Sequence, residues 1–177
     1  MINKINVYDI VRDNFRTLVH DSDGTRSDWD IALFVVVPAI ASASLLYFKG
    51  VFGQTTGNVL ITAFSIFAAL LFNLLLLVYD IVKKSNNELT TTKARFLKQV
   101  YSNISYSVFI SISLIAILLA YFVALASPKL VYVKYGLAFL VYALTANFLL
   151  TMLMILRRVH ILLSKEFEPP NDSALKQ

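Results

Sequence analysis

The 177-residue chain has a hydrophobic fraction of 58%, a charged fraction of 15% and a mean hydropathy of +0.68. Soluble domains have about 45–50% apolar and about 25% charged residues, so a soluble globular domain and a disordered chain are both excluded. The chain has no Cys, which excludes disulfides, thiolate nucleophiles and Cys-based metal sites. Only His20 and His160 could serve as imidazole ligands or bases. The composition therefore predicts an integral membrane protein that needs no cofactor and is not an enzyme.

The first thirty residues are predicted to form an amphipathic helix and a turn at the membrane surface. Apolar residues recur there at helical spacing, with charged residues between them: Ile5, Tyr8, Val11, Phe15, Leu18 and Val19. The helix could pack under the membrane domain, or it could sense lipids and regulate the protein. The acidic residues that follow do not have the spacing of a calcium-binding EF-hand loop.

Four apolar runs predict four transmembrane helices, because each approaches or exceeds the roughly 20 apolar residues that cross a bilayer. Lipid offers no hydrogen-bond partners, and continuous apolar runs favour helices over a β-barrel. We therefore expect an all-α integral membrane fold with its transmembrane domain over 31–163 and a flexible tail over 164–177. The four spans are expected over 31–48, 59–82, 105–126 and 130–156. The basic connection between the second and third spans is expected over 83–104.

The Lys and Arg residues predict the orientation of these spans. Thirteen of the sixteen fall before the first span, between the second and third, or after the fourth. The three others lie at the opposite ends of the spans: Lys49, Lys129 and Lys134, the last of them near the start of the fourth span. Because cytoplasmic segments carry the excess of positive charge, both termini are expected to be cytoplasmic.

The expected cytoplasmic ends of three spans bring seven cations together. They are Lys83, Lys84, Lys93, Arg95, Lys98, Arg157 and Arg158. Such a collar usually contacts anionic lipid headgroups. The other interpretation is a binding site for a polyanion, such as a nucleotide or a nucleic acid, with nearby aromatic rings stacking on bases.

Polar uncharged residues form stripes along the predicted spans. No span carries a carboxylate away from its end, which argues against a proton-coupled transporter. The stripes could pack helices closely, or line a water-filled path in an oligomer. Asn73 and Asn147 are expected to pair across helices, within or between subunits. The candidate residues for a pore or for helix contacts are Thr62, Ser65, Asn73, Asp80, Ser107, Ser111, Asn147 and Thr151.

The layout resembles small bacterial membrane effectors of antiphage defence. This resemblance rests on the predicted surface helix, the Ser27-Asp28-Trp29-Asp30 segment, the apolar run over 60–75 and the basic connection. It is most similar to the membrane effector family of the Hailong system, and the four-span component of the Kiwa system is a second candidate. The Hailong resemblance implies a channel-like homo-oligomer, favouring a tetramer, in the bacterial inner membrane. It also implies a partner nucleotidyltransferase whose single-stranded deoxyadenylate product holds the assembly closed.

These observations lead to two functional hypotheses. The first is an oligomeric, channel-like effector that disrupts the inner membrane when triggered and is gated by a cytoplasmic ligand or partner. The second is a non-conducting anchor or sensor subunit that positions a cytosolic partner. An enzyme acting on a membrane substrate has little support, because metalloprotease, serine-hydrolase and P-loop patterns are absent.

The charge distribution makes the orientation testable with reporter fusions. A reporter after Lys49 should be located outside the cytoplasm, and reporters after Asn87 and at the C-terminus should be located inside. The positive-inside rule gives this outcome, and alkaline phosphatase and fluorescent protein fusions measure it. An outside signal at Asn87 would contradict the four-span topology.

Overall fold

The structure is a computed structural model that describes residues 11–12, 28–84 and 91–167. Within these residues all regular structure is helical, which confirms the predicted all-α class. The elements are α2 (Asp28–Lys49), α3 (Gln54–Lys84), α4 (Thr91–Leu125), the short 3₁₀ helix η2 (Pro128–Leu130) and α5 (Val131–Phe167). Of the expected N-terminal surface helix only 11–12 is described; both residues are helical, and Val11 packs against the core.

Three of the helices are long and apolar enough to cross a membrane. They contain the stretches Gln54–Lys84, Leu97–Leu125 and Val131–Ile161. The fourth apolar helix is shorter in its fully described part, Phe34–Phe48. The protein is therefore a helical, membrane-embedded protein, and its described residues include three long apolar helices that could span the membrane and one shorter apolar helix.

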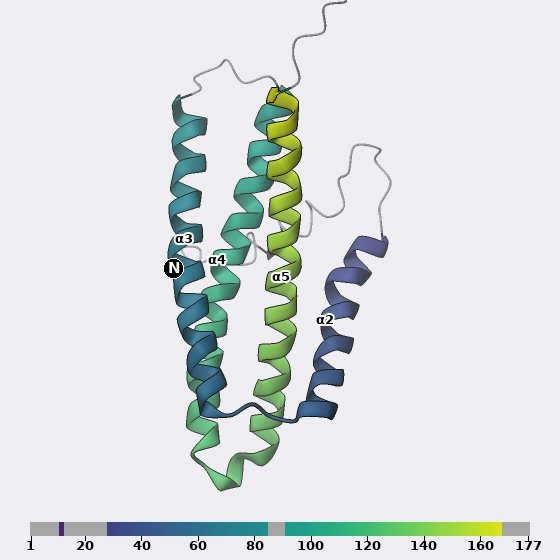
Figure 1. Ribbon diagram of the computed structural model, residues 1–177, viewed down its shortest axis with the longest axis vertical. Coiled ribbons are helices and arrows are strands. Elements are labelled where there is room, and N and C mark those ends of the chain that lie inside the picture. The colour runs from purple at the N-terminus through teal and green to yellow at the C-terminus, as the bar shows by residue number, and fades with distance from the viewer. Residues whose placement is uncertain (1–10, 13–27, 85–90, 168–177) are drawn as a thin grey trace, which may run out of the picture.

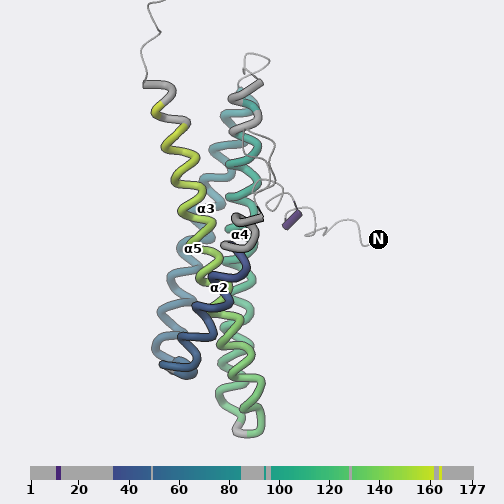
Figure 2. Tube along the Cα trace, turned by 90° about the vertical axis from the view of Figure 1, so that its right-hand side faces the viewer, coloured from purple at the N-terminus to yellow at the C-terminus, as the bar shows by residue number. Residues whose placement is uncertain are grey.

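The helices pack in the order α3, α4, α5, α2. Among the described residues each neighbouring pair in this order is in contact, and α2 contacts α5 but neither α3 nor α4. Figure 1 shows α2 beside one end of α5, and Figure 2 shows the long helices running nearly parallel to one another. Among the described residues, α2 therefore lies at the edge of the helix arrangement, beside α5. Phe148 of α5 completes the three-helix contact by packing against Phe64 and Phe67 of α3.

The core lies along one face of each long helix. On α3 the buried residues recur every seven positions, as Gly57, Phe64, Leu71 and Val78. A seven-residue repeat keeps one face of a helix against its neighbours. The buried face of α4 mixes aliphatic residues with Asn103, Ser107 and Ser111, all of them fully buried.

Two tyrosines hold the connection between α2 and α3. Gly50 ends α2 with a positive φ of 68°, a conformation that glycine adopts at no steric cost. Tyr121 of α4 donates a hydrogen bond to the Phe52 carbonyl, and their rings pack at 4.4 Å between centroids. Tyr142 of α5 donates to the Gly50 carbonyl over 3.5 Å. Backbone carbonyls in this connection are therefore paired by side chains of two other helices.

Helix boundaries differ from the sequence predictions mainly at the ends. The expected spans stop where apolar residues stop, but a helix continues into water as long as its residues favour it. Accordingly α4 begins at Thr91 within the expected basic connection, and α5 continues to Phe167 into the expected tail.

Gly57 generates a stability prediction. A Cβ added there would lie 2.5 Å from Cε1 of Phe122, whereas a Cβ at Gly53 meets no atom within 4 Å. We expect Gly57→Val to lower the free energy of unfolding by about 1–3 kcal/mol through overpacking. Thermal unfolding in detergent measures this, and Gly53→Val is the matched control. Equal effects of the two substitutions would contradict the α3–α4 packing.

Candidate functional site

The first polar site of the protein is created by Pro38 inside α2. Proline has no N–H, so the carbonyl four residues earlier, on Phe34, loses its usual intrahelical donor. Nδ2 of Asn147 on α5 donates to this carbonyl over 3.0 Å. The next polar side chain on α2, Ser42, is fully buried and donates to the Pro38 carbonyl. The unpaired carbonyl of α2 is thereby bonded by α5, the one long helix that α2 contacts in the part of the chain that the structure describes.

Asn147 is also linked to α4. The Tyr106 hydroxyl donates to Oδ1 of Asn147 over 3.2 Å, and Tyr106 is buried. A single amide thus joins three helices near the middle of the apolar stretch of α5. The prediction that Asn147 pairs across helices is confirmed, and the pairing lies within one subunit.

The buried hydroxyls of the predicted stripes bond to their own helices. Ser107 donates to the Asn103 carbonyl, Ser111 to that of Ser107, and Thr151 to that of Asn147, at distances of 3.0, 2.9 and 2.9 Å. All three side chains are fully buried. These contacts favour the close-packing interpretation for the stripes of α4 and α5, since small residues let membrane helices approach.

The stripe on α3 has the opposite surroundings. Thr62, Ser65, Asn73 and Asp80 are all exposed in the single chain. Thr62 donates to the Asn58 carbonyl and Ser65 to that of Ile61, over 3.0 and 2.8 Å. Within the described residues the side chain of Asn73 has no hydrogen bond. The sequence stripe is therefore a polar row on the outer surface of the bundle.

The cations of the predicted collar gather at one end, which we call the basic end: the end of α3 at Lys84, the start of α4 and the end of α5 (Figure 1). Two contacts between antiparallel helices show how far along the helix axes these cations lie. Lys84 is 27 residues after Gly57, and Arg95 is 27 residues before Phe122, which contacts Gly57. Arg158 is 11 residues after Asn147, and Arg95 is also 11 residues before Tyr106. Lys84, Arg95 and Arg158 therefore lie at about the same level.

The side chains at the basic end are accessible where the structure describes them. Lys83, Lys84, Lys98 and Arg157 are exposed, and Arg158 is half-buried. For Lys93 and Arg95 only the position on α4 is described. Four exposed cations from three helices give this end the chemistry to bind phosphate groups, either of lipid headgroups or of a polyanion.

Among the described residues no group of three or more His, Cys, Asp or Glu side chains could hold a metal ion. His160 is exposed on α5. The described part of the chain thus offers two kinds of site: the exposed polar row of α3 and the basic end.

Sequence reasoning did not identify the roles of Tyr106, Tyr121 and Tyr142. Each supplies a hydroxyl to a distant carbonyl or amide, and a tyrosine in an apolar run resembles an interfacial aromatic. Pro38 carried a usable signal, because a proline within a span predicts an unpaired carbonyl four residues earlier. The sequence could not identify which residue pairs with that carbonyl.

Comparison with known proteins identifies no relative. No family model, curated protein or solved structure is significantly similar to this chain.

The Pro38–Asn147 relation can be tested by a double-mutant cycle. Asn147→Leu should destabilise the protein, because it leaves the Phe34 carbonyl unpaired in an apolar environment. In a Pro38→Ala background the restored N–H pairs with that carbonyl, so Asn147→Leu should cost less. We expect a coupling of about 0.6–1.7 kcal/mol, the range of interhelical polar contacts in membranes.

Unfolding of the four proteins in detergent measures the coupling. Tyr106→Phe in both backgrounds is the control, because its hydroxyl bonds to Asn147 and not to α2. Strict additivity of Pro38→Ala and Asn147→Leu would contradict the relation.

Proposed function

We propose that this chain is a multi-pass, channel-like effector of the bacterial inner membrane that functions as a homo-oligomer. It has four spans, with α2 as the first, and both termini in the cytoplasm. A cytoplasmic ligand or partner binds at the basic end and controls permeation. The setting of antiphage defence comes from the resemblance to Hailong-type effectors alone.

The observation that carries this proposal is the exposed polar row of α3. In a single copy this row would contact lipid chains, which offer no hydrogen-bond partner to Asn73. Assembly of several copies around an axis removes the row from lipid and places it at or near a central path. The tight packing of α4 against α5 makes a path between copies more favourable than a path through one copy.

The exposed cations support the ligand part of the proposal. Lys83 and Lys84 lie three and four residues after Asp80 on α3, so the polar row ends beside the cations. A polyanion bound there would lie at the mouth of a path along α3. A short single-stranded DNA or a nucleotide made by a partner nucleotidyltransferase is the ligand that the resemblance implies.

The second candidate is a non-conducting anchor or sensor subunit. It is favoured by the buried hydroxyls, which bond to their own helices and leave a tightly packed interior. On this hypothesis the basic end contacts anionic lipid and a cytosolic partner.

Ion flux from liposomes tests the proposal. The purified protein should release potassium from vesicles of phosphatidylethanolamine and phosphatidylglycerol, and a short oligodeoxyadenylate should suppress this release. Binding through three or four phosphates predicts that the affinity for the oligodeoxyadenylate is roughly 20- to 50-fold weaker at 200 mM than at 50 mM salt. The combined variant Lys84→Gln, Lys98→Gln and Arg157→Gln, which leaves the polar row of α3 intact, should lose suppression and keep the flux.

The matched control is Lys129→Gln with Lys134→Gln, which removes cations from the other end of the bundle and should behave like the wild type. Absence of flux under every condition would contradict the channel-like function and favour the anchor. If the oligodeoxyadenylate does not affect the flux, the basic end binds lipid headgroups and not a nucleic-acid ligand.

A further inference from the structure

The outer surface of α3 carries a regular pattern that extends beyond the polar row. Eight of its residues are separated by alternating steps of three and four, and all eight are exposed. They are Val59, Thr62, Ile66, Ala69, Asn73, Leu76, Asp80 and Lys83. We call these residues the α3 seam. Alternating steps of three and four are the spacing of the contact positions of a left-handed coiled coil.

The seam lies opposite the core face of the same helix. The buried residues Phe64, Leu71 and Val78 are each two residues before a seam residue. Two residues correspond to about 200° around a helix. One face of α3 therefore packs in the bundle with a seven-residue repeat, and the other face carries the same repeat with no neighbour among the described residues.

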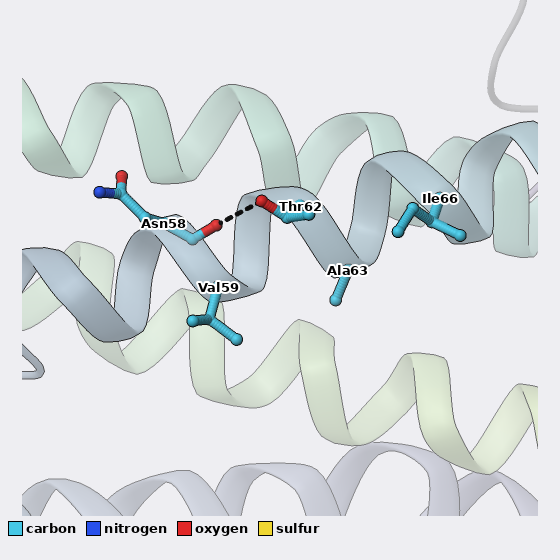
Figure 3. A pocket seen from close by; sticks show the side chains of 5 residues that line it. All are labelled: Asn58, Val59, Thr62, Ala63 and Ile66. Carbon is cyan, nitrogen blue, oxygen red and sulfur yellow. Dashed lines mark hydrogen bonds between the residues drawn. The ribbon is translucent and has the colours of Figure 1, made fainter.

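The structure also contains a hole of the kind that such packing fills. A shallow depression on α3 is lined by Asn58 and by Val59, Thr62, Ala63 and Ile66 (Figure 3). The last four are at positions i, i+3, i+4 and i+7, the four-residue hole that receives one side chain of a facing helix. The Thr62 hydroxyl is engaged by the Asn58 carbonyl of its own helix.

A second copy of this chain is the partner that the seam fits best. Copies insert in the same direction, so two facing α3 helices are parallel and equal residues meet at equal depth. An amide has both donors and an acceptor, so Asn73 of two copies can pair with each other. A single Asn at a contact position also fixes register in coiled coils. Lipid provides none of these partners.

Charges at the basic end of the seam are complementary in the same arrangement. Asp80 and Lys83 are successive seam residues, about 4.5 Å apart along the helix axis. The long side chain of Lys83 can therefore reach Asp80 of the facing copy. The nearby water at this end reduces the repulsion between like charges.

We propose that copies of this chain assemble through parallel packing of their α3 seams, with Thr62 filling the facing hole and the Asn73 amides paired at mid-span. This interface deepens the proposed function, because it rests on the homo-oligomer. It makes α3 the helix nearest the symmetry axis and places α2 on the outside of the assembly.

Cysteine cross-linking tests the interface directly, because the natural chain has no Cys. Ala69→Cys and Leu76→Cys should form disulfide-linked dimers in native membranes treated with copper phenanthroline, since a disulfide needs Cα atoms within about 7 Å. Ile112→Cys on α4 and Leu149→Cys on α5 are controls. The two control side chains are 56% and 55% exposed. Along the helix axes they lie within two residues of the levels of Ala69 and Leu76. They should stay monomeric under the same treatment.

The failure of the interface and of the proposed oligomer give different results. Lysine cross-linking of the wild-type chain reports oligomers whatever their interface. If lysine cross-linking shows oligomers but Ala69→Cys and Leu76→Cys form no disulfide-linked dimers, the seam is not the interface and the proposed homo-oligomer still stands. Equal amounts of dimer at the control sites would lead to the same conclusion. Monomers in both assays would overturn both.

The contribution of Asn73 is tested by two substitutions at the seam. Asn73→Leu should weaken association roughly 3-fold and at most about 20-fold, the equivalent of an interhelical polar contact, whereas Thr62→Val should have little effect because its hydroxyl is already bonded. Monomer stability should be unchanged in both variants, since both sites are exposed. A lower monomer stability in Asn73→Leu, or unchanged association, would contradict pairing between copies.

Discussion

A polar backbone group in hydrocarbon must find its partner within the protein, and the position of α2 depends on this constraint. Pro38 leaves the Phe34 carbonyl without an intrahelical donor, and Asn147 supplies the missing one. Within the described ranges α5 is the one long helix that α2 contacts, so this bond and the tyrosine contacts at Gly50 and Phe52 hold α2 beside the other helices. The half-buried amide of Asn147 also pairs with Tyr106. One side chain therefore couples an irregular helix to two regular ones.

The same constraint gives the two mid-span asparagines different meanings. Asn147 is paired within the chain, and the buried hydroxyls of Ser107, Ser111 and Thr151 are paired within their own helices. Asn73 lies on the outer surface of α3 with no partner among the described residues. The hydroxyl of Thr62, in the same seam, is already bonded to its own helix. In an isolated copy this amide is costly. The proposed assembly through α3 would resolve that cost and would connect the polar row with the cations at the basic end.

The sequence predicts the helical membrane class and the long spans, because uncharged apolar runs permit little else. It also predicts that cations gather at one end, because alternating spans return Lys84, Arg95 and Arg158 to the same level. It does not predict which helices touch. The stripes of α3 and α5 look alike in sequence, yet one is exposed and the other is buried, because packing depends on side-chain shapes across three helices. The peripheral place of α2 is undetermined for the same reason: apolarity drives a helix into the membrane but does not choose its neighbour.

The most direct test of the account is an image of the purified protein in lipid nanodiscs at a resolution that separates helices. The account predicts several copies around a symmetry axis normal to the membrane, with α3 of each copy nearest the axis and α2 at the periphery. A monomeric particle, or an oligomer whose copies meet through α2 or α5 while α3 faces lipid, would contradict it.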